Sequence, residues 1–238
     1  MKTPLTLIEL SNKPILEQLR LEEALLRTDA RNICLINRGS PPAIVMGLSG
    51  VAEELLHPCK TKEASIPVLR RFSGGGCVVV DEETLFITFL FAKKDLPVTP
   101  FPEPILRWGC SLYQEAWKID DFHLIENDYV IGEKKCGGNA QYIQKDRWLL
   151  HTSFLWNFRK ERMDLLQLPK KRPRYREDRS HDQFLCTLKD HALSLSFLID
   201  ALTKHLSLSF DLQRLSEKEF AAICQREHRR ETCTLSPR

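Results

Sequence analysis

The middle of the chain is a succession of short apolar runs, each bounded by residues that favour turns. Runs of this length are typical of strands, because a helix of similar burial needs a longer periodic segment. The predicted strands cover residues 33–37, 43–46, 67–71, 77–80, 85–91, 122–125, 129–131, 141–143 and 148–156. We expect residues 77–80 and 85–91 to pair as a β-hairpin around the polar turn between them.

Helical spacing of apolar residues is found near both ends of the chain and once in the middle. Ser11 and Asn12 followed by Pro14 mark the start of a helix that runs to about Thr28, with Asn12 or Lys13 near the cap and Pro14 inside the first turn. Further predicted helices cover residues 105–117, 190–207 and 215–228, and the last ten residues are expected to fray. Strands in the middle with helices at both ends predict the α+β class, with a mixed or antiparallel sheet flanked by helices.

Length and composition indicate a single globular domain. The 238 residues are 42% hydrophobic and 28% charged, which excludes disordered, collagen-like and coiled-coil chains. No apolar run approaches the roughly 18–20 residues of a membrane span, and the first residues do not resemble an export signal. A net charge of +3 is too small to indicate nucleic acid, and the eight cysteines, none in CxxC spacing, fit a reducing compartment. We therefore expect a cytoplasmic protein without nucleic-acid or membrane partners.

Residues 70–76 read Arg-Arg-Phe-Ser-Gly-Gly-Gly and join two predicted strands. Three consecutive glycines cost conformational entropy, so a fold keeps them where the backbone approaches another group closely or takes positive φ. The backbone N–H groups of such a loop can hold an anion, and the arginines add charge. The pattern matches neither a P-loop nor a dinucleotide-binding turn. On these residues alone, a flexible connection between two strands remains the other interpretation.

A second polar segment, residues 127–141, contains Asn127, Asp128 and Lys135. Lys135 stands between a polar turn and a loop of small residues, and a predicted strand with His151 follows. By itself Lys135 fits a solvated surface lysine, and Asp128 fits a turn residue before a strand.

In this order, the two segments resemble the lipoate–protein ligase A family of the biotin/lipoate ligase superfamily. The matching positions are residues 70–76 with Val78 and Asp81, Asn127 with Asp128, residues 135–140, and the strand from His151 to Asn157. The resemblance covers roughly residues 12–190 and is nearest to ligase-like proteins of plants and some bacteria. It implies the class II ligase-like catalytic fold in a single domain, 1–238, in which residues 190–238 supply the C-terminal helices.

The resemblance also implies roles for individual residues. Lys135 would be the catalytic residue, with its ammonium group directed at the acyl carbonyl and the phosphate oxygens. Residues expected to bind the acyl group or the adenylate are Arg70, Ser73, Gly74, Gly75, Gly76, Val78, Asn127, Asp128, Gly138, Asn139, Ala140 and His151. Asp128 would also face Mg²⁺, so that ATP, Mg²⁺ and lipoate are the implied cofactors and substrates.

The implied activity is ATP-dependent conversion of lipoate, or octanoate, to acyl-AMP, followed by transfer to a lysine of a lipoyl domain. The acceptors would be lipoyl domains of 2-oxoacid dehydrogenases or the glycine cleavage H protein. The chain has no room for the additional C-terminal domain of full-length bacterial ligases, so a separate accessory subunit is possible. The basic block at residues 170–179 either docks an acidic lipoyl domain or is a solvated loop.

Two other functions stay open. The first is an octanoyl- or lipoyltransferase with a cysteine acyl-enzyme, for which Cys136 beside Lys135 is the candidate nucleophile. The second is a non-catalytic paralogue that binds an acyl-adenylate or a lipoyl domain. Val80 stands where the family often has a histidine, which is a departure from its pattern.

Overall fold

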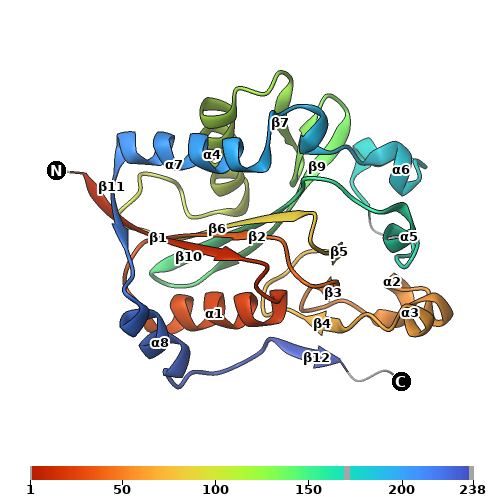
Figure 1. Cartoon of the computed structure of the whole chain (residues 1–238), viewed down its shortest axis with the longest axis horizontal. Helices are drawn as coiled ribbons and strands as arrows, with labels where there is room; N and C mark the ends of the chain where they lie inside the picture. Colours follow the sequence, from red (N-terminus) through yellow and green to blue (C-terminus); the bar gives the residue numbers. More distant parts are fainter. Residues whose placement is uncertain (1, 169–171, 236–238) are drawn as a thin grey trace.

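The structure is a computed structural model that describes residues 2–168 and 172–235. A mixed sheet of eight strands forms its centre, in the order β11-β1-β2-β6-β10-β9-β8-β7 (Figure 1). Its strands are β1 (Thr3–Ser11), β2 (Ile33–Arg38), β6 (Thr84–Ala92), β7 (Phe122–Ile125), β8 (Asp128–Ile131), β9 (Lys134–Ile143), β10 (Arg147–Leu155) and β11 (Phe210–Arg214). β1 runs parallel to β2 and β11, and the other neighbours are antiparallel.

A smaller sheet lies beside one end of the central sheet, in the order β12-β4-β3-β5. Its strands are β3 (Ala43–Met46), β4 (Val68–Arg70), β5 (Cys77–Val80) and β12 (Cys233–Leu235). β3 is parallel to β4 and antiparallel to β5. Both sheets are therefore mixed, whereas the sequence predicts a single sheet that is mixed or antiparallel.

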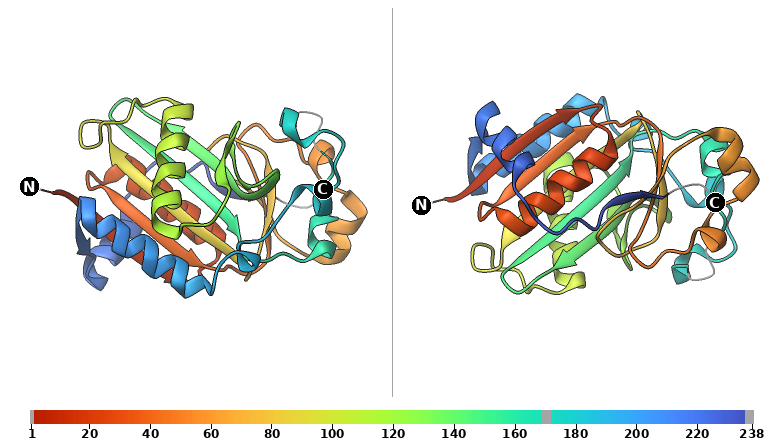
Figure 2. Two further views of the ribbon diagram at one scale, coloured as in Figure 1. Left: turned by 90° about the horizontal axis from the view of Figure 1, so that it is seen from above. Right: turned by 90° about the horizontal axis from the view of Figure 1, so that it is seen from below.

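Helices cover both faces of the central sheet (Figure 2). α4 (Pro102–Trp117) and α7 (Leu195–Ser209) lie on one face, and α1 (Ile15–Thr28) and α8 (Glu217–Gln225) lie on the other. The shorter elements are α2 (Ala52–Leu55), α3 (Pro58–Ala64), α5 (Lys160–Met163), α6 (His181–Phe184) and the 3₁₀ turns η1 (Arg174–Arg176) and η2 (Leu188–Asp190). Within the described residues, no helix is both long enough and apolar enough to cross a membrane.

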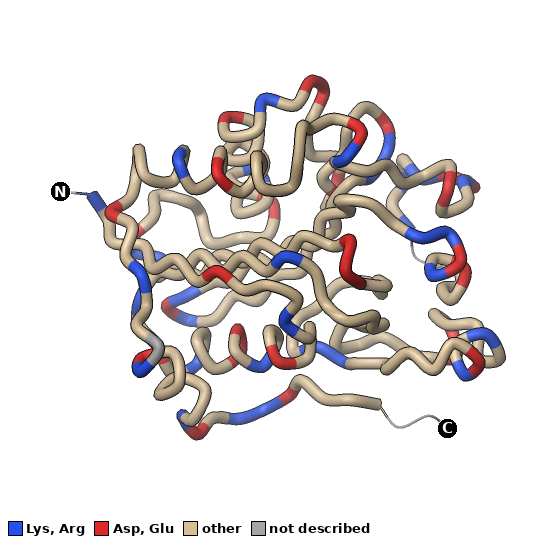
Figure 3. The backbone as a smooth tube through the Cα atoms, viewed as in Figure 1, with Lys and Arg blue, Asp and Glu red and all other residues tan. Residues whose placement is uncertain are grey.

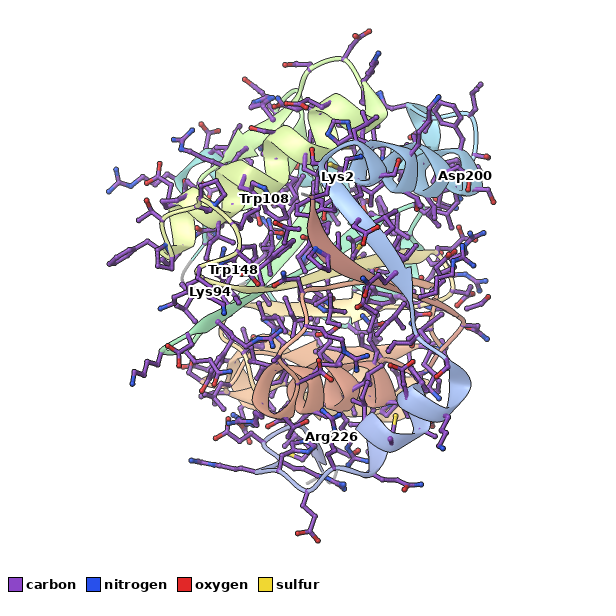
Figure 4. All side chains as sticks on the ribbon, turned by 90° about the vertical axis from the view of Figure 1, so that its left-hand side faces the viewer. Lys2, Lys94, Trp108, Trp148, Asp200 and Arg226 are labelled. Atoms are coloured by element: carbon purple, nitrogen blue, oxygen red, sulfur yellow. The ribbon has the colours of Figure 1, made fainter. Side chains whose placement is uncertain are left out.

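The core under α4 is aromatic. Trp108 of α4 and Trp148 of β10 lie next to one another, with ring centroids 5.5 Å apart and planes at 71° (Figure 4). Such edge-to-face pairs add to the free energy gained from burial. Gly109 allows α4 to lie close to the sheet, because a Cβ atom there would lie 2.4 Å from the Tyr129 hydroxyl oxygen. Outside this core, Lys and Arg residues alternate with Asp and Glu residues over most of the backbone, without segregation of the two charges (Figure 3).

Three local predictions were wrong. β5 and β6 do not form a hairpin, because every residue of β6 is buried and the strand lies between β2 and β10 in the central sheet. Residues 135–140 are part of β9 and not a loop, although glycine has a low strand propensity. The last ten residues are not all frayed, since residues 233–235 form β12 and pair with β4; residues 236–238 lie outside the described range.

Other differences concern element boundaries. The N-cap residue of the first helix is Pro14, which we expected inside the first turn, and no side chain of Asn12 or Lys13 caps the helix. β1 and β11 were not predicted, and they extend the central sheet beyond β2. The predicted basic loop includes residues 169–171, which lie outside the described range, and the 3₁₀ turn η1.

We predict that Gly109→Val lowers the free energy of unfolding by about 2–3 kcal/mol, because the added side chain overlaps Tyr129 and Leu150. The matched control is Ser111→Val at an exposed position of the same helix, which should cost less than about 1 kcal/mol. Urea unfolding of both variants measures the difference. Equal losses would show that helix propensity, and not the close approach of α4 to the sheet, causes the loss in the free energy of unfolding.

Candidate active site

A cleft of about 640 Å³ lies between the small sheet and the β8–β10 part of the central sheet. Its lining has two chemically different parts. One part is apolar and includes Ile15, Leu19, Val45, Val80 and Phe86, which belong to one buried cluster. The other part is polar and basic and includes Lys135, Arg172, Arg176 and His181. A cleft with these two parts suits a ligand that has an apolar chain and a charged end.

His151 lies in the cleft above a buried acid. Glu22 of α1 is fully buried, and its Oε1 lies 3.0 Å from His151 Nδ1. Gln18 and Thr88 also donate hydrogen bonds to the Glu22 carboxylate, at 2.8 and 2.7 Å. A carboxylate in this place orients the imidazole and leaves Nε2 for a group in the cleft.

The glycine loop (residues 73–76) is held in place by the buried guanidinium of Arg71. Arg71 donates hydrogen bonds to the Gly74 carbonyl at 2.8 and 3.2 Å and to the Gly76 carbonyl at 3.0 Å. Burial lowers the pKa of Arg71 to about 10, so the side chain remains cationic near neutral pH. The amide N–H groups of residues 74–76 donate to no other group of the described chain. With the carbonyls bound to Arg71, these donors are available to an anion.

A β-bulge in β9 directs Lys135 into the cleft. Tyr129 pairs with Gly137, but the next residue of β8, Val130, pairs with Lys135, so that Cys136 is the additional residue. In regular alternation Lys135 would face the same side of the sheet as Gly137, whose missing Cβ position is filled by Phe154 of the aromatic core. The bulge reverses this alternation, as bulges near active sites commonly do. Cys136 consequently lies in the core, and Lys135 lies over Gly138 in the cleft.

Lys135 is fixed by an ion pair. Its Nζ lies 2.8 Å from Asp128 Oδ1, and the hydroxyl group of Tyr175 donates to Asp128 Oδ2 at 2.9 Å. Burial, and next the Asp128 carboxylate, raise the pKa of Tyr175 well above its usual range, so the phenol remains a donor. The lysine and aspartate side chains are 23% and 8% exposed, which leaves the ammonium group accessible from the cleft.

Most of the residues predicted from the sequence line this cleft: Gly75, Gly76, Val78, Asn127, Asp128, Lys135, Gly138, Asn139, Ala140 and His151. Three others lie outside its lining. Arg70 donates to the Leu48 carbonyl at 2.7 Å, Ser73 is buried, and Gly74 is exposed. Arg71, and not Arg70, is the arginine that supports the loop.

Sequence reasoning missed Glu22, Arg71 and Tyr175. Glu22 interrupts the apolar face of α1 between Leu19 and Leu26, and a charge at such a position signals a buried polar contact. No signal in the sequence indicates that Tyr175 reaches Asp128, since 47 positions separate them.

Neither the cysteine that lines the cleft nor the cysteine beside Lys135 favours a thiolate nucleophile. Cys77 lines the cleft, but burial raises its pKa to about 12. Cys136 is buried in the core, where burial also raises its pKa well above the usual value. A thiol with a raised pKa is a poor nucleophile.

A protein-held Mg²⁺ does not fit the described residues. They contain no group of three or more His, Cys, Asp or Glu residues that could hold a metal. Both oxygens of Asp128 are already engaged, by Lys135 and by Tyr175. The assignment of Asp128 to Mg²⁺ stays a prediction.

The fold and the cleft agree with the family indicated by the sequence. A sequence model described as the lipoyl protein ligase A/B catalytic domain matches residues 14–207, and the chain belongs to this family. Its place in the biotin/lipoate ligase superfamily and the class II ligase-like fold are thereby confirmed.

Individual relatives are distant. The chain is 24% identical to inactive lipoate–protein ligase 2 of Plasmodium falciparum, over 89% of this chain and 71% of that protein. Matches to two bacterial ligases span only 34% and 33% of those proteins. The fold is similar to a lipoate–protein ligase A crystallised with ATP (TM-score 0.74, 19% identity, 94% of this chain and 93% of that chain). It is also similar to a bipartite ligase from Thermoplasma acidophilum (TM-score 0.73, 22% identity, 94% and 91%).

We predict that Gly75→Ala destabilises the protein and that Gly74→Ala does not. Gly75 has a φ of +107°, and a Cβ atom there would lie 2.6 Å from Arg71 Nη2, whereas a Cβ atom on Gly74 meets nothing within 4 Å. The strained backbone and the displaced guanidinium should cost about 1–3 kcal/mol, against less than about 0.5 kcal/mol for the control. Thermal unfolding of both variants measures this, and equal midpoints would exclude Arg71 as the support of the loop.

Proposed function

We propose that this chain is a lipoate–protein ligase that activates lipoate, or octanoate, with ATP and transfers the acyl group to a lysine of a lipoyl domain. The observation that carries the proposal is the position of Lys135. Its side chain lines the cleft and is held by Asp128, and the rest of the lining includes an apolar cluster and further basic side chains. A fixed cation in this place suits the carboxylate end of an acyl chain and the phosphate that activates it.

The reaction has two steps. In the first, a carboxylate oxygen of the fatty acid attacks the α-phosphorus of ATP, and pyrophosphate leaves. In the second, the neutral amine of the acceptor lysine attacks the acyl carbon, AMP leaves with the bonding electron pair, and the amine loses a proton. The enzyme needs no nucleophile of its own, which agrees with the absence of a low-pKa cysteine among the described residues that line the cleft.

Two structures similar in fold support the choice of substrates. One contains ATP, and another, a lipoate ligase from Thermoplasma acidophilum, contains lipoic acid. The bipartite ligase was studied with its E2 lipoyl domain, which supports a lipoyl domain as the acceptor. Basic residues along the 172–179 segment suit an acidic acceptor surface.

A second candidate is a paralogue that binds these ligands without turnover. The relative from Plasmodium falciparum is named inactive, and Val80 of this chain replaces the histidine that the family often has.

The test is incubation of the purified chain with an apo lipoyl domain, lipoate and Mg-ATP, followed by mass spectrometry of the domain. An amide-linked lipoyl group with release of pyrophosphate supports the ligase, and binding without either product supports the paralogue. Acyl-AMP without transfer would indicate that a separate accessory subunit completes the reaction.

We predict that Lys135→Ala lowers acyl transfer by about 100-fold or more, because the charge that stabilises the acyl and phosphate oxygens is lost. Lys134→Ala is the matched control, since Lys134 is the exposed neighbour on the same strand. Gly138→Val should lower transfer by about 10- to 100-fold without loss of stability, because the new side chain displaces Lys135 from its place over Gly138. Transfer at the wild-type rate by Lys135→Ala would refute the role of this residue.

We also predict that Cys136→Ser and Cys77→Ser retain most of the transfer activity. The first side chain lies in the core, and the second lines the cleft as a protonated thiol. Intact-protein mass spectrometry without acceptor should find no hydroxylamine-sensitive acyl group. An acyl adduct on either cysteine would support the transferase mechanism instead.

A further inference from the structure

Cys136 and Cys186 come from distant parts of the chain and lie side by side. Leu185 forms a parallel bridge with Lys135, and the Cys186 backbone N–H group donates to the Lys135 carbonyl at 2.9 Å. The two cysteines are the next residues along these paired segments, and both pack against the aromatic core. Neighbouring strands lie about 4.8 Å apart, and a disulfide joins Cα atoms that are roughly 4.4–6.8 Å apart. This pairing therefore suits a disulfide between the two residues.

The two thiols contact one another and differ in exposure. Cys136 is fully buried, and its Sγ donates to the Tyr129 carbonyl at 3.4 Å; Cys186 is half-buried, and its Sγ donates to the Lys134 carbonyl at 3.3 Å. A hydrogen bond with the Cys136 thiol lowers the pKa of Cys186, while burial raises the pKa of Cys136. The more accessible thiol with the lower pKa reacts first with an oxidant, and a thiol in contact with it can resolve the product. Cys186 thus has the features of the attacking thiol, and Cys136 those of the resolving thiol.

The second cysteine is the last residue of the segment 172–186, which forms one side of the cleft. His181 of this segment lines the cleft, and Tyr175 donates to Asp128, the carboxylate that holds Lys135. A covalent bond between this segment and β9 would restrict its local opening, because conformations in which it leaves the sheet are removed. The oxidation state of the two thiols therefore bears on the contacts that fix Lys135.

We propose that Cys136 and Cys186 are a redox-sensitive pair that forms a reversible disulfide and fixes the segment 172–186 against β9. The oxidant is a low-molecular-weight disulfide such as oxidised glutathione. Cys186 loses its proton and attacks one sulfur of the oxidant, whose disulfide bond breaks, and one glutathione leaves. Cys136 then loses its proton and attacks the Cys186 sulfur, and the second glutathione leaves. Two protein thiols are oxidised, and one glutathione disulfide takes up the two electrons and two protons as two thiols; excess reduced glutathione reverses both steps.

Incubation of the purified full chain in glutathione buffers with a stepwise higher oxidised share, followed by acid quenching, alkylation and peptide mass spectrometry, tests the pair. A joined peptide with Cys136 and Cys186 should appear, and dithiothreitol should remove it. The exposed Cys59 and Cys233 are internal references, which should carry glutathione only. The matched control is Cys224→Ser, which removes an exposed thiol and should leave the joined peptide unchanged. Cys186→Ser should leave Cys136 as a free thiol.

Hydrogen exchange measures the effect of the disulfide on the segment. Amides of residues 174–185 should exchange about fivefold or more slowly in the oxidised chain than in the reduced chain. Cys186→Ser should show no such difference, and Cys136→Ala replaces this variant if it does not fold.

Two results would overturn the disulfide: both cysteines still reduced in a buffer that modifies Cys59, or a lasting glutathione adduct on Cys186 without the joined peptide. Equal exchange in the two states would overturn the fixing of the segment. None of these measurements uses ATP, lipoate or a lipoyl domain, so their outcome is independent of the proposed function.

Discussion

The candidate site depends on one irregularity of the backbone, the bulge that places Lys135 and Cys136 together opposite Val130. Strict alternation along β9 would direct Lys135 toward the aromatic core, where a charge without a partner is very costly. The bulge reverses the faces of the sheet to which Lys135 and Cys136 point, so that the thiol is buried and the ammonium group reaches Asp128. Gly138 completes the arrangement, since the lysine side chain occupies the space next to its missing Cβ.

Several charged side chains near the cleft are buried, and they differ in whether the protein provides partners for them. Glu22 beneath the cleft has three protein partners, and Arg71 beside it holds the glycine loop by its carbonyl groups. These two charges are compensated within the protein, and each fixes an element that borders the cleft. Arg176 is buried to a similar extent. Glu22 and Arg71 thus have partners within the protein, whereas the Nη2 group of Arg176 has none among the described residues.

Much of the architecture could be predicted because it follows from local patterns. The apolar runs at residues 43–46 and 122–125 coincide with β3 and β7, and the periodic segment from residue 105 coincides with most of α4. Predictions failed where long-range packing overrides local preference. β5 and β6 belong to different sheets because β6 is buried on both faces, and the glycines of β9 are in a strand because Phe154 and Lys135 occupy the adjacent space.

The sequence by itself determined the α+β class, the family, and ten of the residues that line the cleft, because these depend on residue types at fixed spacing along the chain. It could not determine which arginine supports the glycine loop, since Arg70 and Arg71 are neighbours that face different surroundings. Nor could it place Glu22 under His151 or Tyr175 on Asp128, which are contacts between distant segments. Only the tertiary structure decided these, because side-chain direction depends on strand register and bulges, and partner choice depends on which distant elements pack together.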